Sequence, residues 1–163
     1  MELRKSLLGL TNSRFADRFS LNLNGSLIFT EVNLGEFAVA QDKVRPLQGQ
    51  SPYTLNGALY YDDPSNLSGS VVYNVIGPRI FSVGDVLFPT IYEMPRHSLD
   101  ISLTKNFGNS LSVKAGIQNI LNSAYKFYQD SDRSNHIRLD RDHPIIEYQR
   151  GQSFNVTFGY HFK

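Results

Sequence analysis

The 163-residue chain contains no cysteine and no tryptophan, only two methionines, and no apolar run long enough for a membrane helix. Without cysteine it has neither a disulfide framework nor a thiolate metal site. Its formal net charge is +1, and lysine and arginine form no block that would suggest contact with DNA or RNA. The sequence therefore argues against a disulfide-stapled scaffold and predicts no nucleic-acid partner.

Aromatic residues are abundant, with nine tyrosines and eleven phenylalanines, and such residues favour β-strands. The pattern is sharpest in residues 151–162, where apolar and polar residues alternate. Since side chains alternate with period two along a strand, Phe154 and Phe158 share one face while Asn155 and Thr157 share the other. This segment is predicted to be a strand with an apolar environment on a single side.

The same alternation recurs along most of the chain, which indicates an all-β fold. The predicted strands are residues 19–30, 53–61, 67–76, 98–104, 111–118 and 151–162, with a possible strand end at 1–7. Three long segments, 31–52, 77–95 and 123–150, show no sustained period and are predicted to be loops, whereas 62–66 and 106–109 have the chemistry of tight turns. We expect an antiparallel up-and-down meander whose connections are alternately short and long, starting with a link at 8–17.

Alternating connection lengths are typical of outer-membrane barrels, which have short turns on the periplasmic side and long loops outside. Charge placement agrees, because no charged residue falls on the apolar face of an interior strand position. Asp100 and Lys114 lie on polar faces, where we expect them to pair across neighbouring strands. Lysine or arginine facing lipid at the bilayer midplane would cost about 2 to 4 kcal/mol. The chain is therefore predicted to be part of a transmembrane β-barrel.

Aromatic residues are expected to collect at the rim that carries the short turns. Rings at both membrane boundaries form the aromatic girdles of such barrels. The residues predicted to lie there are Phe19, Tyr60, Tyr61, Phe107, Tyr160 and Phe162.

Three stretches resemble the TonB-dependent outer-membrane receptors. Residues 113–125, VKAGIQNILNSAY, look like that family's penultimate strand, where an N-[LI]-[FL]-N-x-x-Y stretch opens the last long loop. Residues 151–162 are similar to its barrel-closing strand, and 95–100 look like the start of its third-from-last strand. One departure is Lys163 after Phe162, since the family commonly ends on the aromatic residue itself.

The resemblance implies a barrel of about 22 strands around a plug, so residues 1–163 would be the C-terminal barrel section, with plug and upstream strands absent. It further implies location in the bacterial outer membrane and active uptake of a bulky, scarce ligand such as a siderophore, cobalamin or glycan. The implied partners are outer-membrane lipid, a TonB-type energy-coupling complex acting through the absent plug, and the barrel-assembly machinery at the C-terminal strand. Such transport makes and breaks no bond, and the resemblance implies no cofactor.

Ligand contacts are expected from the long loops. The candidates in the last loop are Tyr125, Tyr128, Arg133 and His136, with Phe127, Arg138 and Tyr148 beside them, and those in the middle loop are Arg79 and Tyr92, with Phe81. The alternative for each of these residues is that it packs the loops together or faces water.

Metal and catalytic motifs are weak. Residues 130–135 resemble the start of a calcium loop but lack its glycine at the sixth position and its glutamate at the twelfth, where Arg141 stands. His136, Asp140, Asp142 and His143 match no established metal spacing. Because the chain has no nucleophile elbow, phosphate loop or paired-carboxylate arrangement, we expect neither a resident metal nor an enzyme.

Two other readings stay open at this point. A soluble β-sandwich that binds sugar or protein would bury the apolar faces against a second sheet. A small self-contained outer-membrane barrel of about eight strands, structural or adhesive, would need at least one strand more than the pattern provides.

Overall fold

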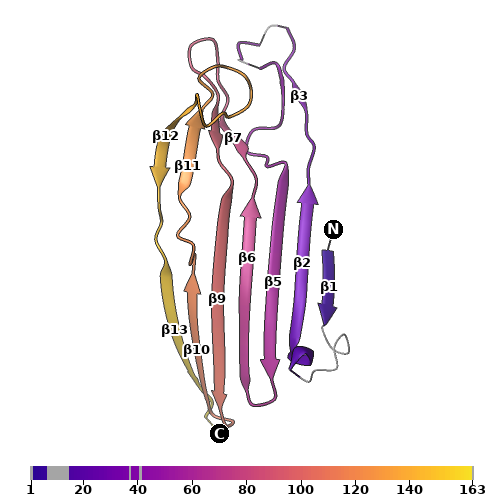
Figure 1. Cartoon of the computed structure of the whole chain (residues 1–163), viewed down its shortest axis with the longest axis vertical. Helices are drawn as coiled ribbons and strands as arrows, with labels where there is room; N and C mark the ends of the chain where they lie inside the picture. The colour runs from indigo at the N-terminus through magenta and orange to yellow at the C-terminus, as the bar shows by residue number, and fades with distance from the viewer. Residues whose placement is uncertain (1, 7–14, 37, 41, 163) are drawn as a thin grey trace.

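The computed structural model describes residues 2–6, 15–36, 38–40 and 42–162, and these form an all-β structure. The lower sheet in Figure 1 has seven antiparallel strands in the order β1-β2-β5-β6-β9-β10-β13, so strands adjacent in this sheet follow one another along the chain. Its strands are β1 (Glu2–Ser6), β2 (Phe19–Leu27), β5 (Tyr53–Asp63), β6 (Leu67–Ile76), β9 (Arg96–Phe107), β10 (Leu111–Gln118) and β13 (Ser153–Tyr160). The predicted all-β antiparallel meander is confirmed.

Helical structure among the described residues is confined to η1, a 3-10 turn at Ala16–Arg18 that precedes β2. Among all the described residues, no helix has the length and apolar character needed to cross a membrane. Most of the predicted 8–17 link lies outside the described residues.

The connections separate by length onto the two ends of the lower sheet. Turns at 64–66 and 108–110 join strands at the lower end, whereas the long connections 28–52, 77–95 and 119–152 all lie at the upper end (Figure 1). This arrangement confirms the predicted alternation of short and long connections. It places every candidate ligand residue at one end of the molecule.

The long connections contain six short strands, so the prediction that they are only loops is wrong. β3 (Val32–Asn33) pairs with β4 (Val44–Arg45), while β7 (Arg79–Ser82), β8 (Ile91–Glu93), β11 (Tyr125–Gln129) and β12 (His143–Tyr148) form the upper sheet. These strands are two to six residues long, and irregular pairing interrupts them between Ile80 and Ser82 and between Phe127 and Tyr128. An alternation of apolar and polar residues cannot be recognised in strands that are so short and irregularly paired.

The upper sheet extends the lower sheet instead of covering it. Its strand order is β12-β11-β8-β7, and these four strands directly precede or follow β13, β10, β9 and β6 in the chain. The order across the sheet is therefore the same at both levels, and Figure 1 shows the upper strands standing above the lower ones. The result is one tall single-layered wall.

The strand register sorts apolar and polar residues onto opposite faces of the lower sheet. Val113 of β10 lies opposite Phe158 of β13, and Ile117 lies opposite Phe154. Phe154 is 70% exposed and Phe158 is 73% exposed, so no described segment covers this apolar face. The buried apolar side chains of the described residues are Val75, Ile80 and Phe127, which lie at or above the upper end. The lower sheet has no core of its own.

Two expectations about charged residues are corrected by the register. β9 continues to Phe107 and thereby places Lys105 on the apolar face, where its Nζ donates to the Ser65 carbonyl of the neighbouring turn at 2.8 Å. The long side chain thus carries its ammonium group away from the apolar face to the lower rim. Asp100 and Lys114 are not paired, because Lys114 stands opposite Thr104.

Aromatic residues gather at the lower rim, as predicted. Phe19 packs 5.0 Å from Tyr61 and 5.2 Å from Phe15, measured between ring centroids. Tyr160 lies 4.8 Å from Phe162. Tyr60 lies beside Tyr61 near the same end of β5, on the polar face opposite Ser20 and Ser70, as the alternation predicts.

Candidate functional site

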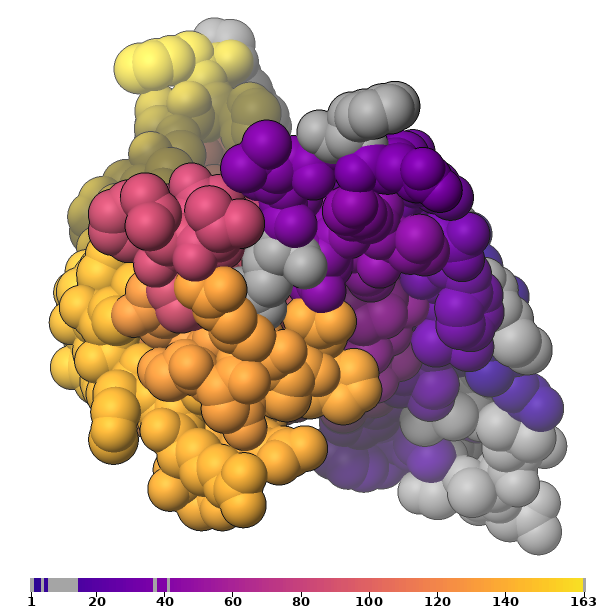
Figure 2. All heavy atoms as spheres, turned by 90° about the horizontal axis from the view of Figure 1, so that it is seen from above, coloured from indigo at the N-terminus to yellow at the C-terminus, as the bar shows by residue number. Residues whose placement is uncertain are grey.

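The three long connections meet above the lower sheet and form what we call the loop assembly, residues 28–52, 77–95 and 119–152 (Figure 2). The Gly49 N–H donates to the Ile80 carbonyl at 2.9 Å, which joins the first connection to the second. The Asp130 N–H donates to the Thr90 carbonyl at 2.9 Å, which joins the second to the third. The loop assembly is therefore held together by its own contacts.

Asp130 and Asp142 shape the third connection from inside. Asp130 has no exposed surface, and its carboxylate accepts the N–H groups of Ser134 at 2.9 Å and Asn135 at 2.8 Å. Asp142 is 2% exposed and accepts the N–H of Ser131 at 2.9 Å and that of Arg138 at 2.7 Å. Such bonds fix loops that have no regular backbone partner.

Asp132 joins these two aspartates in a group whose carboxylate oxygens lie within 4.8 Å of one another. Hydrogen bonding from Ser134 holds the pKa of Asp132 below its usual range. Backbone N–H groups occupy the carboxylates of Asp130 and Asp142, whereas a calcium loop turns backbone carbonyls toward its ion. The geometry accounts for residues 130–135 as a hydrogen-bonded loop.

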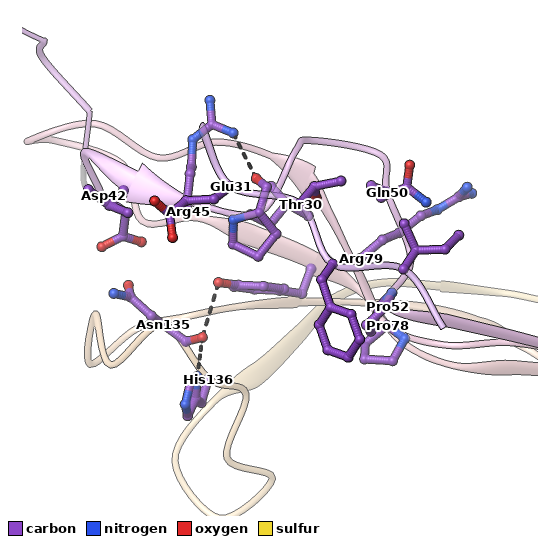
Figure 3. Close-up of a pocket in the computed structure, with 16 residues that line it drawn as sticks. Thr30, Glu31, Asp42, Arg45, Gln50, Pro52, Pro78, Arg79, Asn135 and His136 are labelled. Atoms are coloured by element: carbon purple, nitrogen blue, oxygen red, sulfur yellow. Dashed lines mark hydrogen bonds between the residues drawn. The ribbon is translucent and has the colours of Figure 1, made fainter. Parts of the chain in front are cut away.

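A large cavity of about 710 Å³ opens among the three connections (Figure 3). Figure 3 shows Asn135 and His136 on one side of it, facing Glu31 and Arg45 on the other. Its apolar lining is Ile28, Phe29, Val44, Pro46, Pro52, Pro78 and Ile80, and its polar lining is Thr30, Glu31, Asp42, Arg45, Gln50, Arg79, Tyr92, Asn135 and His136. The volume of this cavity lies within the range of small-molecule sites, and its lining offers both apolar contacts and hydrogen-bonding groups.

Tyr92 supplies the phenol in the lining of the large cavity. Its hydroxyl donates to the Asn135 carbonyl at 3.2 Å. Burial, together with the negative charges of Asp130 and Asp42, raises the pKa of Tyr92 to about 12. The phenol is therefore a neutral hydrogen-bonding group at any physiological pH.

A smaller cavity of about 190 Å³ lies at the junction of the two sheets, lined by Ile76, Gly77, Arg79, Glu93, Met94, Arg96, Tyr125 and Arg150. Arg79 forms an ion pair with Glu93 at 2.7 Å. The guanidinium carbons of Arg96 and Arg150 each lie 4.6 Å from the centroid of the Tyr125 ring. Three arginines and one glutamate thus share the smaller cavity.

The predicted NILN stretch forms the break between β10 and β11. Asn119 and Asn122 both have left-handed backbone conformations, with φ of 54° and 45°. The Asn119 side chain donates to the Gly151 carbonyl at 2.7 Å, and its N–H donates to Asp100 Oδ1 at 2.8 Å. Asparagine tolerates this conformation better than most residues do. The Asn119 side chain therefore holds the backbone that follows Arg150 against this break.

The structure brings four of the six main candidate ligand residues to cavities. Arg79, Tyr92 and His136 line the large cavity, and Arg79 and Tyr125 line the smaller one, so that Arg79 belongs to both. The other two line neither of these cavities. Tyr128 pairs with Tyr92 across the upper sheet, and Arg133 donates to the Val86 carbonyl at 2.7 Å.

Four further candidates make packing contacts within the loop assembly. Phe127 is buried and packs 4.7 Å from Phe81, and Tyr148 stacks 4.9 Å from Tyr125, measured between ring centroids. Arg138 pairs with Asp132 at 3.6 Å. For these residues the contacts agree with the alternative that they hold the loops together.

Sequence reasoning missed Arg96, Arg150 and the cavity residues of the first connection. Arg96 carried a usable signal, since it opens a strand and falls on the polar face of the alternation. Arg150 and the residues near 46–50 carried none, because their neighbours in space are distant in sequence.

Comparisons of the chain with protein-family models, with curated proteins and with solved structures found no match. The described residues provide two cavities, one within the loop assembly and one at the junction of the two sheets, and a lower sheet with one apolar and one polar face.

Proposed function

We propose that the chain forms part of the wall of a β-barrel in the bacterial outer membrane, as the C-terminal section of a TonB-dependent receptor. The observation that carries the proposal is the uncovered apolar face of a single-layered sheet. Ile101 and Leu103 in its middle are 41% and 50% exposed, and Phe158 at its edge is 73% exposed. Such a continuous apolar surface is a liability in water and is stable against acyl chains.

The free edges of the lower sheet support membership of a larger barrel. β1 and β13 stand at opposite edges and do not pair with each other. Unpaired strand edges cannot remain within lipid, because their backbone N–H and C=O groups would lack partners. Further strands would have to complete the barrel, which favours a receptor section over a small self-contained barrel.

A soluble β-sandwich is the less favoured reading. It requires a second sheet packed across the apolar faces. The four-stranded upper sheet instead continues the lower sheet, and Phe154 and Phe158 stay open. A sandwich would also not explain why all the long connections lie at one end of the sheet.

In the proposed receptor, the loop assembly faces the outside and the polar face lines the lumen. The large cavity takes part of a bulky, scarce ligand such as a siderophore, cobalamin or glycan. A TonB-type energy-coupling complex drives transport through the plug, and the barrel-assembly machinery reads β13 during insertion. The chain contributes binding and a path, with no catalytic step.

Spin labels on neighbouring residues of β6 test which face meets lipid. Val71 and Val72 have the same side chain but lie on opposite faces, opposite Ile101 and Asp100 respectively. In the intact parent protein in lipid vesicles, a label at Val71→Cys should collide mainly with oxygen, which concentrates in the bilayer. A label at Val72→Cys should collide mainly with a water-soluble nickel complex. Equal access of the nickel complex to both labels would overturn the membrane assignment.

Uptake measurements test the transport part separately. Deleting the parent gene should abolish accumulation of one member of a panel of labelled ferric siderophores, cobalamin and oligosaccharides. Inactivating the inner-membrane motor should have the same effect, because the proposed transport is energy-coupled. Uptake that persists at the wild-type rate without the motor would rule out a TonB-dependent receptor.

A further inference from the structure

The smaller cavity carries an excess of positive charge that its own residues do not neutralise. Arg79 is paired with Glu93, with the guanidinium Nε and Nη2 atoms 2.8 and 2.7 Å from the same carboxylate oxygen. Arg96 and Arg150 have no carboxylate within ion-pair distance among the described residues. The cavity therefore has two arginines for which no counter-charge is provided.

The position of these arginines is fixed by Tyr125. Both guanidinium carbons lie 4.6 Å from its ring centroid, within the range of cation–π attraction. Tyr125 itself is held by stacking on Tyr148 at 4.9 Å, with the rings within 1° of parallel. Because the ring is held by the upper sheet, the two guanidinium groups are pre-organised before any ligand arrives.

This arrangement suits an anion. A guanidinium group carries five N–H donors, and attraction of its charge to a ring does not use them as hydrogen-bond donors to an anion. Guanidinium forks match the planar carboxylate and the phosphate group, and their charge-assisted hydrogen bonds are the stronger kind. Arg96 opens β9 on the polar face, opposite Ile76, so the pair is directed toward the side that the proposed barrel keeps wet.

We propose that the smaller cavity binds an anionic group of the transported ligand, a carboxylate or a phosphate, through Arg96 and Arg150. The inference rests on the proposed function, which it deepens by naming the ligand class. Arg79 lines both cavities, so they lie on either side of, or around, one shared residue. The ligand class is thus amphipathic: an apolar body occupies the large cavity while its acidic group is held between the arginines.

Anion binding to the purified intact parent protein in detergent tests this inference. The probes are citrate and pyrophosphate, with raffinose as a neutral compound, titrated by calorimetry at matched ionic strength. Arg96→Gln and Arg150→Gln should each weaken binding of the responsive anion about tenfold, the loss expected for one charge-assisted hydrogen bond. Binding of citrate alone identifies a carboxylate site and binding of pyrophosphate alone a phosphate site, and either supports the inference.

Arg141→Gln is the matched control. Arg141 is an exposed arginine in the same long connection as Arg150, and its guanidinium group lies 3.8 Å from the Asp132 carboxylate. It should leave anion affinity unchanged. If the double variant Arg96→Gln, Arg150→Gln binds as tightly as this control, or if the wild type binds neither anion, the inference is overturned. Heat-modifiable migration on gels reports barrel folding independently, so a folded barrel without anion binding would refute the ligand class and leave the receptor proposal standing.

Discussion

The lower sheet and the loop assembly are stabilised in different ways. The lower sheet is one layer thick, with an open face on either side, and Val75 is its only buried apolar residue among those described. The loop assembly contains the buried Ile80 and Phe127 and every buried polar side chain of the described residues, namely Ser51, Thr90, Asp130 and Asp142. One region depends on its surroundings, and the other depends on contacts within itself.

Substitutions in the lower sheet and in the loop assembly should therefore have different effects. Strand pairing satisfies the backbone of the lower sheet, and in the proposed barrel its apolar face is buried by contact with lipid. In the loop assembly, buried carboxylates replace regular backbone pairing. Substitutions on the sheet faces should therefore affect membrane insertion, and those in the loop assembly should affect local order.

The largest effect is expected from arginine at Val71. Val71→Arg places a charge on the apolar face between Leu59 and Ile101, and should destabilise the inserted protein by about 2 to 4 kcal/mol. Val72→Arg, one residue later, faces Asp100 and should have little effect. Urea unfolding of the intact protein in vesicles measures both. Equal destabilisation by the two variants would contradict the assignment of the faces.

Removing the Asp130 carboxylate should loosen only the loop assembly. Asp130→Ala leaves the Asn135 N–H without its acceptor, while the Ser134 N–H keeps Asp132 Oδ1 at 3.1 Å, so the expected cost is about 1 to 3 kcal/mol. Hydrogen exchange should accelerate across 130–142, while membrane insertion is retained. Asp140→Ala is the control, because its side chain is 78% exposed. A loss of insertion in Asp130→Ala would show that the two regions are not separate.

Asn119 links the two regions, and two substitutions there separate its roles. Asn119→Gly tolerates the φ of 54° but loses the bond to the Gly151 carbonyl, whereas Asn119→Ala loses the bond and also strains the backbone. The alanine variant should be less stable than the glycine variant by about 1 kcal/mol. Chemical unfolding in detergent measures the difference, and the reverse order would argue against backbone conformation as the reason for asparagine here.

The smallest effect is a change of pH dependence at Tyr92. Because its pKa is raised from 10 to about 12, the unfolded chain releases this proton between pH 10 and 12 while the folded loop assembly keeps it. Stability of the loop assembly should therefore be unaffected by this group below pH 10 and fall as pH rises through that window. Limited proteolysis at pH 9 and 11 should detect the loss.

Tyr92→Phe should remove that part of the alkaline sensitivity, because phenylalanine has no proton to release. Tyr128→Phe, on the paired strand β11, is the matched control and should keep it. If proteolysis of Tyr92→Phe rises between pH 9 and 11 as steeply as that of the control, Tyr92 is not the group responsible.

The alternation of apolar and polar residues predicted the lower sheet well, because each strand shows this pattern in its own sequence. Residues 67–76 and 111–118 were predicted with the bounds that β6 and β10 have. β9 proved longer at both ends, since His97 and Lys105 break the apolar pattern without ending the strand pairing. The short upper strands escaped prediction because bulges and their length remove the period.

The candidate site was predictable only in part. Arg79, Tyr92, Tyr125 and His136 could be named because they are large polar or aromatic residues in long connections. No local pattern indicated that residues near 46 would meet residue 135, or that Arg150 would lie over Tyr125. Such contacts depend on how three separate connections fold over one another.

By itself, the sequence determined which side chains share a face and at which end the long connections lie, since period-two geometry and turn chemistry are local properties of the backbone. Only the tertiary structure decided that the upper strands continue the lower sheet and that Arg96 and Arg150 converge on one ring. Such convergence depends on the strand register and on the path of the long connections. Both are set by interactions between residues that lie far apart in the sequence.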